Sequence, residues 1–284
     1  MEAITSAYFS LANSEWLPYA LLALAFAMLL QSLFGAPATF DSEQSGKAPP
    51  AAEEEEEPDP PRDFTTEQLR KFNGVVTEDD KFNPDAGKIY ICLKGTVYNV
   101  SAAANMYGPG GNYHLFAGRD ASLALAKMSF EDQHLDNPDL SGISAVEMDQ
   151  LEQWINKYKY EKEYPVVGKL STPPARRPMT VEELAEFNGA GAVPEDRVDP
   201  PLYVGIKGKV YDVSYGGFDM YKPGTTYNIF AGKDSSRSLA TMQFDEIKSR
   251  KIDDLTPEQL KTMDDWDIKF ETKRFYPIVG DLTN

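Results

Sequence analysis

The sequence predicts an α+β protein with two similar domains behind an N-terminal apolar segment. Three observations support this class: a stretch of roughly a hundred residues occurs twice, each copy combines strand-like and helix-like patterns, and residues 17–34 form an uncharged, mostly apolar run. The 284 residues are enough for two domains of ordinary size. The content of 42% hydrophobic and 26% charged residues is typical of globular proteins.

The apolar run follows a short N-terminal segment, residues 1–16. As a helix, residues 17–34 would span roughly 27 Å, about the thickness of a thin bilayer core. A cleaved signal peptide is the alternative, but Glu2 and Glu15 are the only charges before the run, so the positive n-region is missing. The first basic residue, Lys47, follows the run, which favours a single-pass anchor with the C-terminal part in the cytosol.

Residues 35–62 are rich in proline and acidic residues and poor in hydrophobic ones, which predicts an extended, disordered tether. The chain carries a formal net charge of −17. Because phosphate binding needs a basic face, this charge argues against nucleic acid as a partner. An acidic surface would suit a basic docking surface on another protein, although solubility explains the charge equally well.

Four blocks of the remaining sequence occur twice in the same order, at offsets of 112 to 115 residues. So little drift indicates a tandem duplication, with a first domain over 63–170, a stiff linker over 171–178 and a second domain over 179–284. The paired blocks are "FTTEQLRKFNG" and "MTVEELAEFNG", "IYICLKGTVYNVS" and "LYVGIKGKVYDVS", "NMYGPGGNYHLFAGRD" and "DMYKPGTTYNIFAGKD", and "LEQWINKYKYEKEYPVVGKL" and "MDDWDIKFETKRFYPIVGDL".

Each copy opens with a helix, because "TTEQL" and "TVEEL" place a capping threonine before a glutamate in the first turn. "IYICLKGTVYNV" then predicts two short strands around a Lys-Gly turn. The loops ending in "AGRD" and "AGKD" enter helices, with Asp120 and Asp234 as the expected caps. A longer helix follows, which in the second copy starts with Thr256 as cap and Pro257 at its first position. "YPVVG" and "YPIVG" predict a closing strand.

Several residues are expected in the core. The lone cysteine, Cys92, can form no disulfide within the chain, which suits a reducing compartment. Its apolar surroundings favour a buried strand residue over a haem thiolate. Tyr98 and Tyr211 on the strands, and Trp154 and Trp266 on the long helices, are predicted to be core residues.

The helix "EELAEFNG", the strand pair "IKGKVYDVS" and the paired tyrosine loops together resemble the cytochrome b5-like haem/steroid-binding domain, in particular its membrane-associated progesterone receptor branch. The resemblance covers nearly all of residues 63–284, twice. It implies a small mixed sheet in each copy, with helices that frame a haem cleft. Where cytochrome b5 carries a haem-ligating histidine before its Pro-Gly pair, this chain has Gly108 and Lys222, so bis-histidine ligation is not expected.

The resemblance implies that one loop tyrosine per copy, Tyr113 and Tyr227, is the axial iron ligand. It also places four further tyrosines beside the cofactor: Tyr107, Tyr164, Tyr221 and Tyr276. On composition alone, the loop tyrosines would instead be aromatics that seal the domain edge.

The sequence departs from the family pattern immediately before the third tyrosine. The family's lysine is replaced by Glu163 and Phe275, with Lys162 and Arg274 one residue earlier, which puts a salt bridge to a haem propionate in doubt.

Three other side chains near the loops have weaker functional interpretations. His114 is expected to be a surface residue rather than a second ligand, because the second copy has asparagine there and contains no histidine at all. A propionate contact from Arg119 or Lys233 is a secondary possibility.

The implied function is a membrane-anchored haem-binding protein that serves as an adaptor, regulator or haem chaperone for cytochrome P450 enzymes in sterol metabolism. It would carry one or two haem b groups at the endoplasmic reticulum membrane, although other endomembranes or the plasma membrane also fit. Exposed haem faces would allow haem-mediated self-association. No catalytic constellation occurs in the sequence, so an enzyme is not predicted. A sterol-binding module, a cytochrome b5-type electron carrier and a haem-free scaffold are the alternatives.

Overall fold

The computed structural model describes residues 60–80, 83, 85–244 and 250–283, all within one compact unit. The predicted N-terminal segment (1–16), the anchor (17–34) and the tether up to residue 59 lie outside these residues. Within the described ranges, no helix has both the length and the apolar character needed to cross a membrane. Residues 60–171 are called the first half below, and residues 177–283 the second half.

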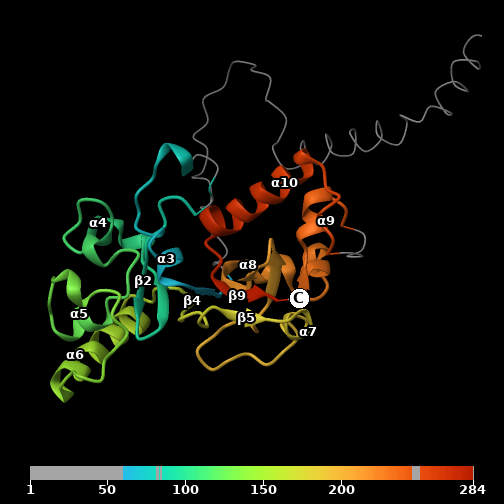
Figure 1. The fold of residues 1–284 in the computed structure, drawn as a ribbon. Helices are drawn as coiled ribbons and strands as arrows, with labels where there is room; N and C mark the ends of the chain where they lie inside the picture. The colour runs from blue at the N-terminus through green and yellow to red at the C-terminus, as the bar shows by residue number, and fades with distance from the viewer. Residues whose placement is uncertain (1–59, 81–82, 84, 245–249, 284) are drawn as a thin grey trace, which may run out of the picture. The chain divides into compact units, whose positions relative to one another are not determined.

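A mixed four-stranded sheet of order β1-β4-β3-β2 organises the first half (Figure 1). β2 and β3 form the predicted antiparallel hairpin, and its turn places Lys94 and Gly95 at positive φ. β1 is parallel to β4 and pairs Arg62 with Gly168, so the last residue of the predicted tether already belongs to the sheet. The strands are β1 (Arg62–Phe64), β2 (Tyr90–Leu93), β3 (Thr96–Asn99) and β4 (Val166–Leu170).

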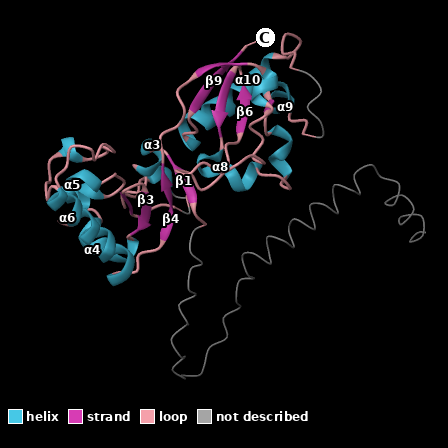
Figure 2. Cartoon of the chain, turned by 90° about the horizontal axis from the view of Figure 1, so that it is seen from below, coloured by secondary structure: helices cyan, strands magenta, loops and turns pink. Residues whose placement is uncertain are grey.

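Helices α4, α5 and α6 gather on one side of this sheet (Figures 1 and 2). Thr65 caps the first helix, as predicted, in a capping box with Gln68, and Ser144 forms the same device at α6. α6 continues into a π-helical turn, Lys157–Glu161, a feature often found at functional sites. The helices are α3 (Thr66–Leu69), α4 (Ala104–Tyr107), α5 (Ser122–Ala126) and α6 (Ala145–Asn156).

The second half repeats this order and adds one edge strand, giving β5-β9-β7-β6-β8. β5 starts at Arg177 and is parallel to β9, so the predicted linker, residues 171–178, ends inside the sheet. The strands are β5 (Arg177–Met179), β6 (Tyr203–Ile206), β7 (Lys209–Asp212), β8 (Lys233–Asp234) and β9 (Ile278–Leu282). The helices are α7 (Val181–Leu184), α8 (Ser214–Tyr221), α9 (Ser236–Thr241) and α10 (Pro257–Ile268), followed by a π-helical turn, Lys269–Arg274.

The predicted helix caps are confirmed at three threonines, Thr65 and the two of the second half, and are wrong at two aspartates. Thr180 and Thr256 accept backbone N–H bonds in the first turns of α7 and α10, and Pro257 is the first residue of α10. α5 and α9 begin one residue later than predicted, so Asp120 and Asp234 are not their caps. Each aspartate instead accepts bonds from the backbone and hydroxyl of the serine two residues on, as in an Asx turn.

Each sheet has a buried cluster on both faces. Successive strand residues alternate between the two clusters, because their side chains point to opposite faces. In the first half, Ile91 and Tyr98 face the α4–α6 side, whereas Cys92 faces a second cluster. Tyr98, Tyr211 and Cys92 are buried as predicted. Trp154 and Trp266 are only half-buried; they pack at the edge of the core rather than anchoring its centre.

A buried guanidinium, Arg197, connects the two halves. It bonds Asp63 of the first half at 2.8 Å and Asp212 of the second at 3.4 Å, and the side chains of all three are nearly inaccessible to solvent. Its Nη2 group donates to the Ser214 hydroxyl at 2.7 Å, and its Cζ atom lies 4.0 Å from the ring centroid of Tyr215. Asp63 also accepts backbone N–H bonds from the two residues after Arg197, so its charge is well compensated.

We predict that Arg197→Met lowers the free energy of unfolding by about 3–5 kcal/mol, because two carboxylates would remain buried without their cation. Urea unfolding of the full chain measures this loss. Arg176→Met is the matched control, because Arg176 pairs with Asp281 in an exposed position, where less than about 1 kcal/mol is expected. Equal losses in the two variants would contradict the central role of Arg197.

Candidate functional site

The first tyrosine loop leaves α4 through a glycine that has no room for a side chain. A Cβ on Gly108 would lie only 2.5 Å from the carbonyl oxygen of Ala104. The loop then closes through a bond of 3.0 Å from the Tyr113 backbone N–H to the carbonyl of Met106. The position where cytochrome b5 carries its histidine is therefore sterically closed to any side chain in the first half.

The two loop tyrosines of the first half have different environments. Tyr107 is buried, and its hydroxyl accepts a bond of 2.9 Å from Tyr158. Burial raises the pKa of both phenols, so both are neutral at physiological pH. Tyr113 is half-buried, with its ring centroid 6.0 Å from that of Tyr107 and stacked on Phe116. Tyr113 is therefore the more accessible phenol of the pair.

A cavity of about 340 Å³ opens between α4 and the end of α6. Two of the predicted tyrosines, Tyr107 and Tyr164, line it, whereas Tyr113 packs against the same core outside the lining. The Nε1 atom of Trp154, another lining residue, is buried with no hydrogen-bond partner among the described residues. The other lining residues are Met106, Lys157, Tyr158, Glu161 and Lys162.

The corresponding cavity of the second half has a volume of about 120 Å³. All three predicted tyrosines, Tyr221, Tyr227 and Tyr276, line it. Tyr221 is buried, while Tyr227 is 38% exposed, which repeats the contrast seen in the first half. Except for Glu161, every residue that lines the first cavity has its counterpart in the second. These counterparts are Met220, Tyr221, Trp266, Lys269, Phe270, Arg274 and Tyr276.

The two cavities also differ at two aromatic positions, one in residue type and one in burial. Phe270 replaces Tyr158 and has no hydroxyl to offer Tyr221. Tyr276 is 4% exposed, whereas its counterpart Tyr164 is only half-buried. The Tyr276 hydroxyl has no hydrogen-bond partner among the described residues, and burial raises its pKa to about 12. The first cavity falls within the usual range for small-molecule sites, about 300–1,000 Å³, and the second is smaller.

The residues before the third tyrosines adopt a left-handed backbone conformation. Glu163 has φ of 51° and Phe275 has φ of 55°, directly after the π-helical turns. Lys162 and Arg274, one residue earlier, line the two cavities. The cationic position of the family is thus shifted by one residue in both halves, yet it still reaches the cleft.

The two histidines and Arg119 bond to groups outside the two cavities. His114 is half-buried rather than on the surface, with Nε2 3.0 Å from the carbonyl oxygen of Asn73, and His134 Nδ1 lies 2.9 Å from the Ser129 hydroxyl. Arg119 pairs with Asp136 at 2.6 Å instead of facing a cleft. No cluster of three or more His, Cys, Asp or Glu residues suited to a metal ion occurs in the described ranges.

Sequence reasoning overlooked Tyr158, the partner of Tyr107. Its separation of four residues from Trp154 on one helix was the available signal, since residues at this spacing share a helix face. It also overlooked Asp63 and Arg197, whose pairing spans the two halves and leaves no local pattern.

The sequence is similar to a known domain family and to several characterised relatives. The cytochrome b5-like heme/steroid binding domain matches residues 65–171 and 180–264. "Membrane steroid-binding protein 2" of Arabidopsis thaliana is 38% identical over 54% of this chain and 61% of its own length. "Cytochrome P450 regulator dap1" of Schizosaccharomyces pombe is 35% identical over 44% of this chain and 73% of its own. "Membrane-associated progesterone receptor component 2" of Rattus norvegicus is 35% identical over 39% of this chain and 48% of its own.

We predict that Tyr158→Phe destabilises the protein by about 1–3 kcal/mol, because the buried Tyr107 hydroxyl loses its partner. Chemical denaturation measures the change. Tyr160→Phe is the control, because Tyr160 lies in the same π-helical turn but is 65% exposed, and little change is expected there. A Tyr158→Phe variant as stable as Tyr160→Phe would show that the Tyr107–Tyr158 bond contributes nothing to stability.

Proposed function

The chain belongs to the cytochrome b5-like heme/steroid binding domain family, and on that premise we propose that it is a membrane-anchored haem-binding adaptor or regulator rather than an enzyme. The observation that carries this proposal is the pair of corresponding cavities, each lined by a buried loop tyrosine. The more exposed loop tyrosine lines the second cavity, and in the first half it packs against the core beside the cavity. At each cavity a buried polar atom, Trp154 Nε1 or Tyr276 Oη, has no hydrogen-bond partner within the described part of the chain, which fits sites that accept a ligand.

We further propose that the two halves are tandem copies of one domain, over 63–170 and 179–284, joined by residues 171–178. The shared strand order and the two separate matches of the family model support this proposal. Because β1 and β5 begin at Arg62 and Arg177, the sheet of each copy starts slightly before the proposed boundary.

Tyr113 and Tyr227 are the proposed iron ligands. They are the more accessible member of each loop pair, and a phenolate is an established axial ligand of ferric haem. Tyr107 and Tyr221 are buried and neutral, which suits hydrogen bonding beside the cofactor rather than ligation. Tyr164 and Tyr276 would form part of the wall of the first and the second haem site, respectively. When bound, the haem would supply an iron centre with one protein ligand and one open face.

Cationic side chains at the cavity mouths suit the carboxylates of haem b. Lys157 and Lys162 line the first cavity, and Lys269 and Arg274 line the second. We assign the first half as the stronger candidate site, because its cavity is the larger. In the cavity of the second half, Tyr276 or its neighbours would need to move before a cofactor could enter.

Steroid binding is the second candidate function. A relative from Arabidopsis is named as a steroid-binding protein, and one from rat as a progesterone receptor component. The aromatic walls of the cavities suit a flat apolar ligand. A cytochrome b5-type electron carrier is a weaker candidate, because both histidines are bonded elsewhere in the first half and the second half has none.

The partner and the membrane are also proposals. A relative named as a cytochrome P450 regulator supports P450-type enzymes as partners. The names of other relatives support membrane association, for which residues 17–34 are the proposed single-pass anchor. We propose the endoplasmic reticulum as the compartment, with both copies in the cytosol.

We predict that Tyr113→Phe and Tyr227→Phe each remove one haem and that the double variant binds none, because phenylalanine cannot ligate iron. Absorbance spectroscopy of haem-titrated protein measures this, with a high-spin ferric spectrum expected for the unaltered chain. Tyr160→Phe is the control. Full haem occupancy in the double variant would refute the ligand assignment. Sharp low-spin bands on reduction would indicate histidine ligation, and sterol binding without any haem spectrum would favour the second candidate function.

We also predict haem-mediated self-association, because one protein ligand leaves the opposite haem face open for stacking. Sedimentation velocity should show a larger species when haem is added to the unaltered chain. The Tyr113→Phe/Tyr227→Phe double variant should sediment as before. Unchanged sedimentation of the haem-loaded unaltered chain would rule out stacking between chains.

A further inference from the structure

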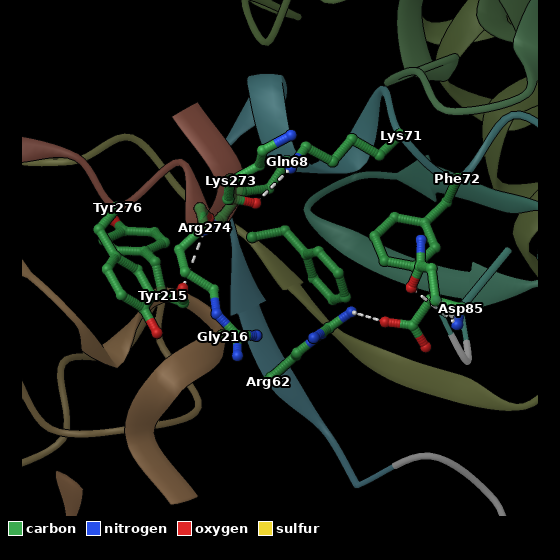
Figure 3. Close-up of a pocket in the computed structure, with 12 residues that line it drawn as sticks. Arg62, Gln68, Lys71, Phe72, Asp85, Tyr215, Gly216, Lys273, Arg274 and Tyr276 are labelled. Atoms are coloured by element: carbon green, nitrogen blue, oxygen red, sulfur yellow. Dashed lines mark hydrogen bonds and ion pairs between the residues drawn. The ribbon is translucent and has the colours of Figure 1, made fainter. Parts of the chain in front are cut away.

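A third cavity, of about 200 Å³, lies where the two halves meet (Figure 3). Arg62, Gln68 and Lys71 line it from the first half, and Lys273 and Arg274 from the second. It is distinct from both clefts: none of its lining residues borders the first cleft, and only Arg274 and Tyr276 also border the second.

Hydrogen bonds from side chains of the first half to backbone carbonyls of the second half connect the two sides of this cavity. The amide of Gln68 donates to the carbonyl oxygens of Tyr215, at 2.9 Å, and Arg274, at 3.1 Å. The Lys71 ammonium donates to the carbonyl of Lys273 at 2.9 Å and lies 3.6 Å from the ring centroid of Phe275. Because these contacts come from both halves, the cavity exists only in their assembled arrangement.

The cavity concentrates positive charge in a strongly acidic protein. Its lining contains four cations, Arg62, Lys71, Lys273 and Arg274, and one carboxylate, Asp85. Arg62 pairs with Asp85 at 3.5 Å. The other three cations have no carboxylate within ion-pair distance among the residues that the structure describes. Burial, reinforced by the neighbouring cations, lowers the pKa of Lys71 to about 8. Such mutual repulsion would be relieved by an anion.

A neutral donor and aromatic surfaces complete the lining. Tyr276 is 4% exposed, and its hydroxyl is buried without a hydrogen-bond partner among the described residues. Phe64, Phe72 and Tyr215 supply apolar walls. A group that combined a negative charge with a small apolar or aromatic part would match both kinds of surface.

We propose that the junction cavity binds a small organic anion, a phosphate or carboxylate with an aromatic part, and that this ligand bridges the two halves. Its volume equals roughly six or seven water molecules at about 30 Å³ each, enough for one anionic group and a single ring. The proposal does not depend on haem binding, because Arg62, Gln68 and Lys71 lie outside both clefts.

Isothermal titration calorimetry of the full, haem-free chain tests this site, with phenyl phosphate, benzoate and inorganic phosphate as probes at low salt. Saturable binding of at least one aromatic anion is expected. Lys71→Gln should weaken it at least tenfold, whereas Lys71→Arg should retain it. Lys127→Gln is the matched control, because Lys127 pairs with Glu147 away from the junction and should not alter binding. Equal affinities in Lys71→Gln and Lys127→Gln, or no saturable binding of any probe, would overturn the proposal.

Two further titrations identify the source of the anion. They also distinguish a failure of this proposal from a failure of the proposed haem site. Tyr227→Phe should bind the probe as tightly as the unaltered chain, whether or not haem ligation is assigned correctly. If haem-loaded protein excludes the probe and Tyr227→Phe treated with haem does not, the cavity receives a carboxylate of haem held in the second cleft. If both bind the probe equally, the ligand is a separate small molecule.

Discussion

The buried guanidinium of Arg197 fixes how the two halves of this protein meet. It is shared between Asp63 of the first half and Asp212 of the second, and it lies over the ring of Tyr215. A charge removed from water must be neutralised by groups in good geometry, so few other arrangements of β1 against α8 would be tolerated. The bonds of Gln68 and Lys71 to backbone carbonyls of the second half, and the cavity that these residues line, depend on that arrangement.

The corresponding clefts of the two halves differ in size and in their contacts with the junction. The second half has one residue more between Ser214 and Met220 than the first half has between Ser101 and Met106. Gly216 lies in this longer segment and adopts a φ of 78°. The segment brings Tyr215 to the junction and Gly217 against the hydroxyl of Tyr276, where a Cβ would clash. A phenylalanine at the position of Tyr158 removes the hydroxyl that bonds Tyr107 in the first half. The second cleft is therefore narrower and is coupled to the junction, whereas the first is wider and independent of it.

Charge is distributed unevenly relative to these cavities. The chain is acidic as a whole, yet the mouths of both clefts and the junction cavity carry lysine and arginine. Isolated cations with low-dielectric walls attract anionic ligands more strongly than the net charge suggests. Haem carboxylates at the clefts and a small organic anion at the junction are both consistent with this distribution, and an acidic exterior remains free to contact a basic partner.

The sequence by itself determined the repeat, the hairpins, the threonine caps and the burial of the strand tyrosines, because each depends on neighbouring residues or on a short period. It also identified the tyrosine loops, although only the assembled fold separates the accessible Tyr113 from the buried Tyr107. The aspartate caps were misplaced by one residue, because an Asx turn and a helix cap share the same local pattern. Only the tertiary structure decided that Asp63 and Arg197 pair across 134 positions of sequence and that four cations surround one cavity. Such contacts join residues with no local relationship, and the packing of the two halves alone brings them together.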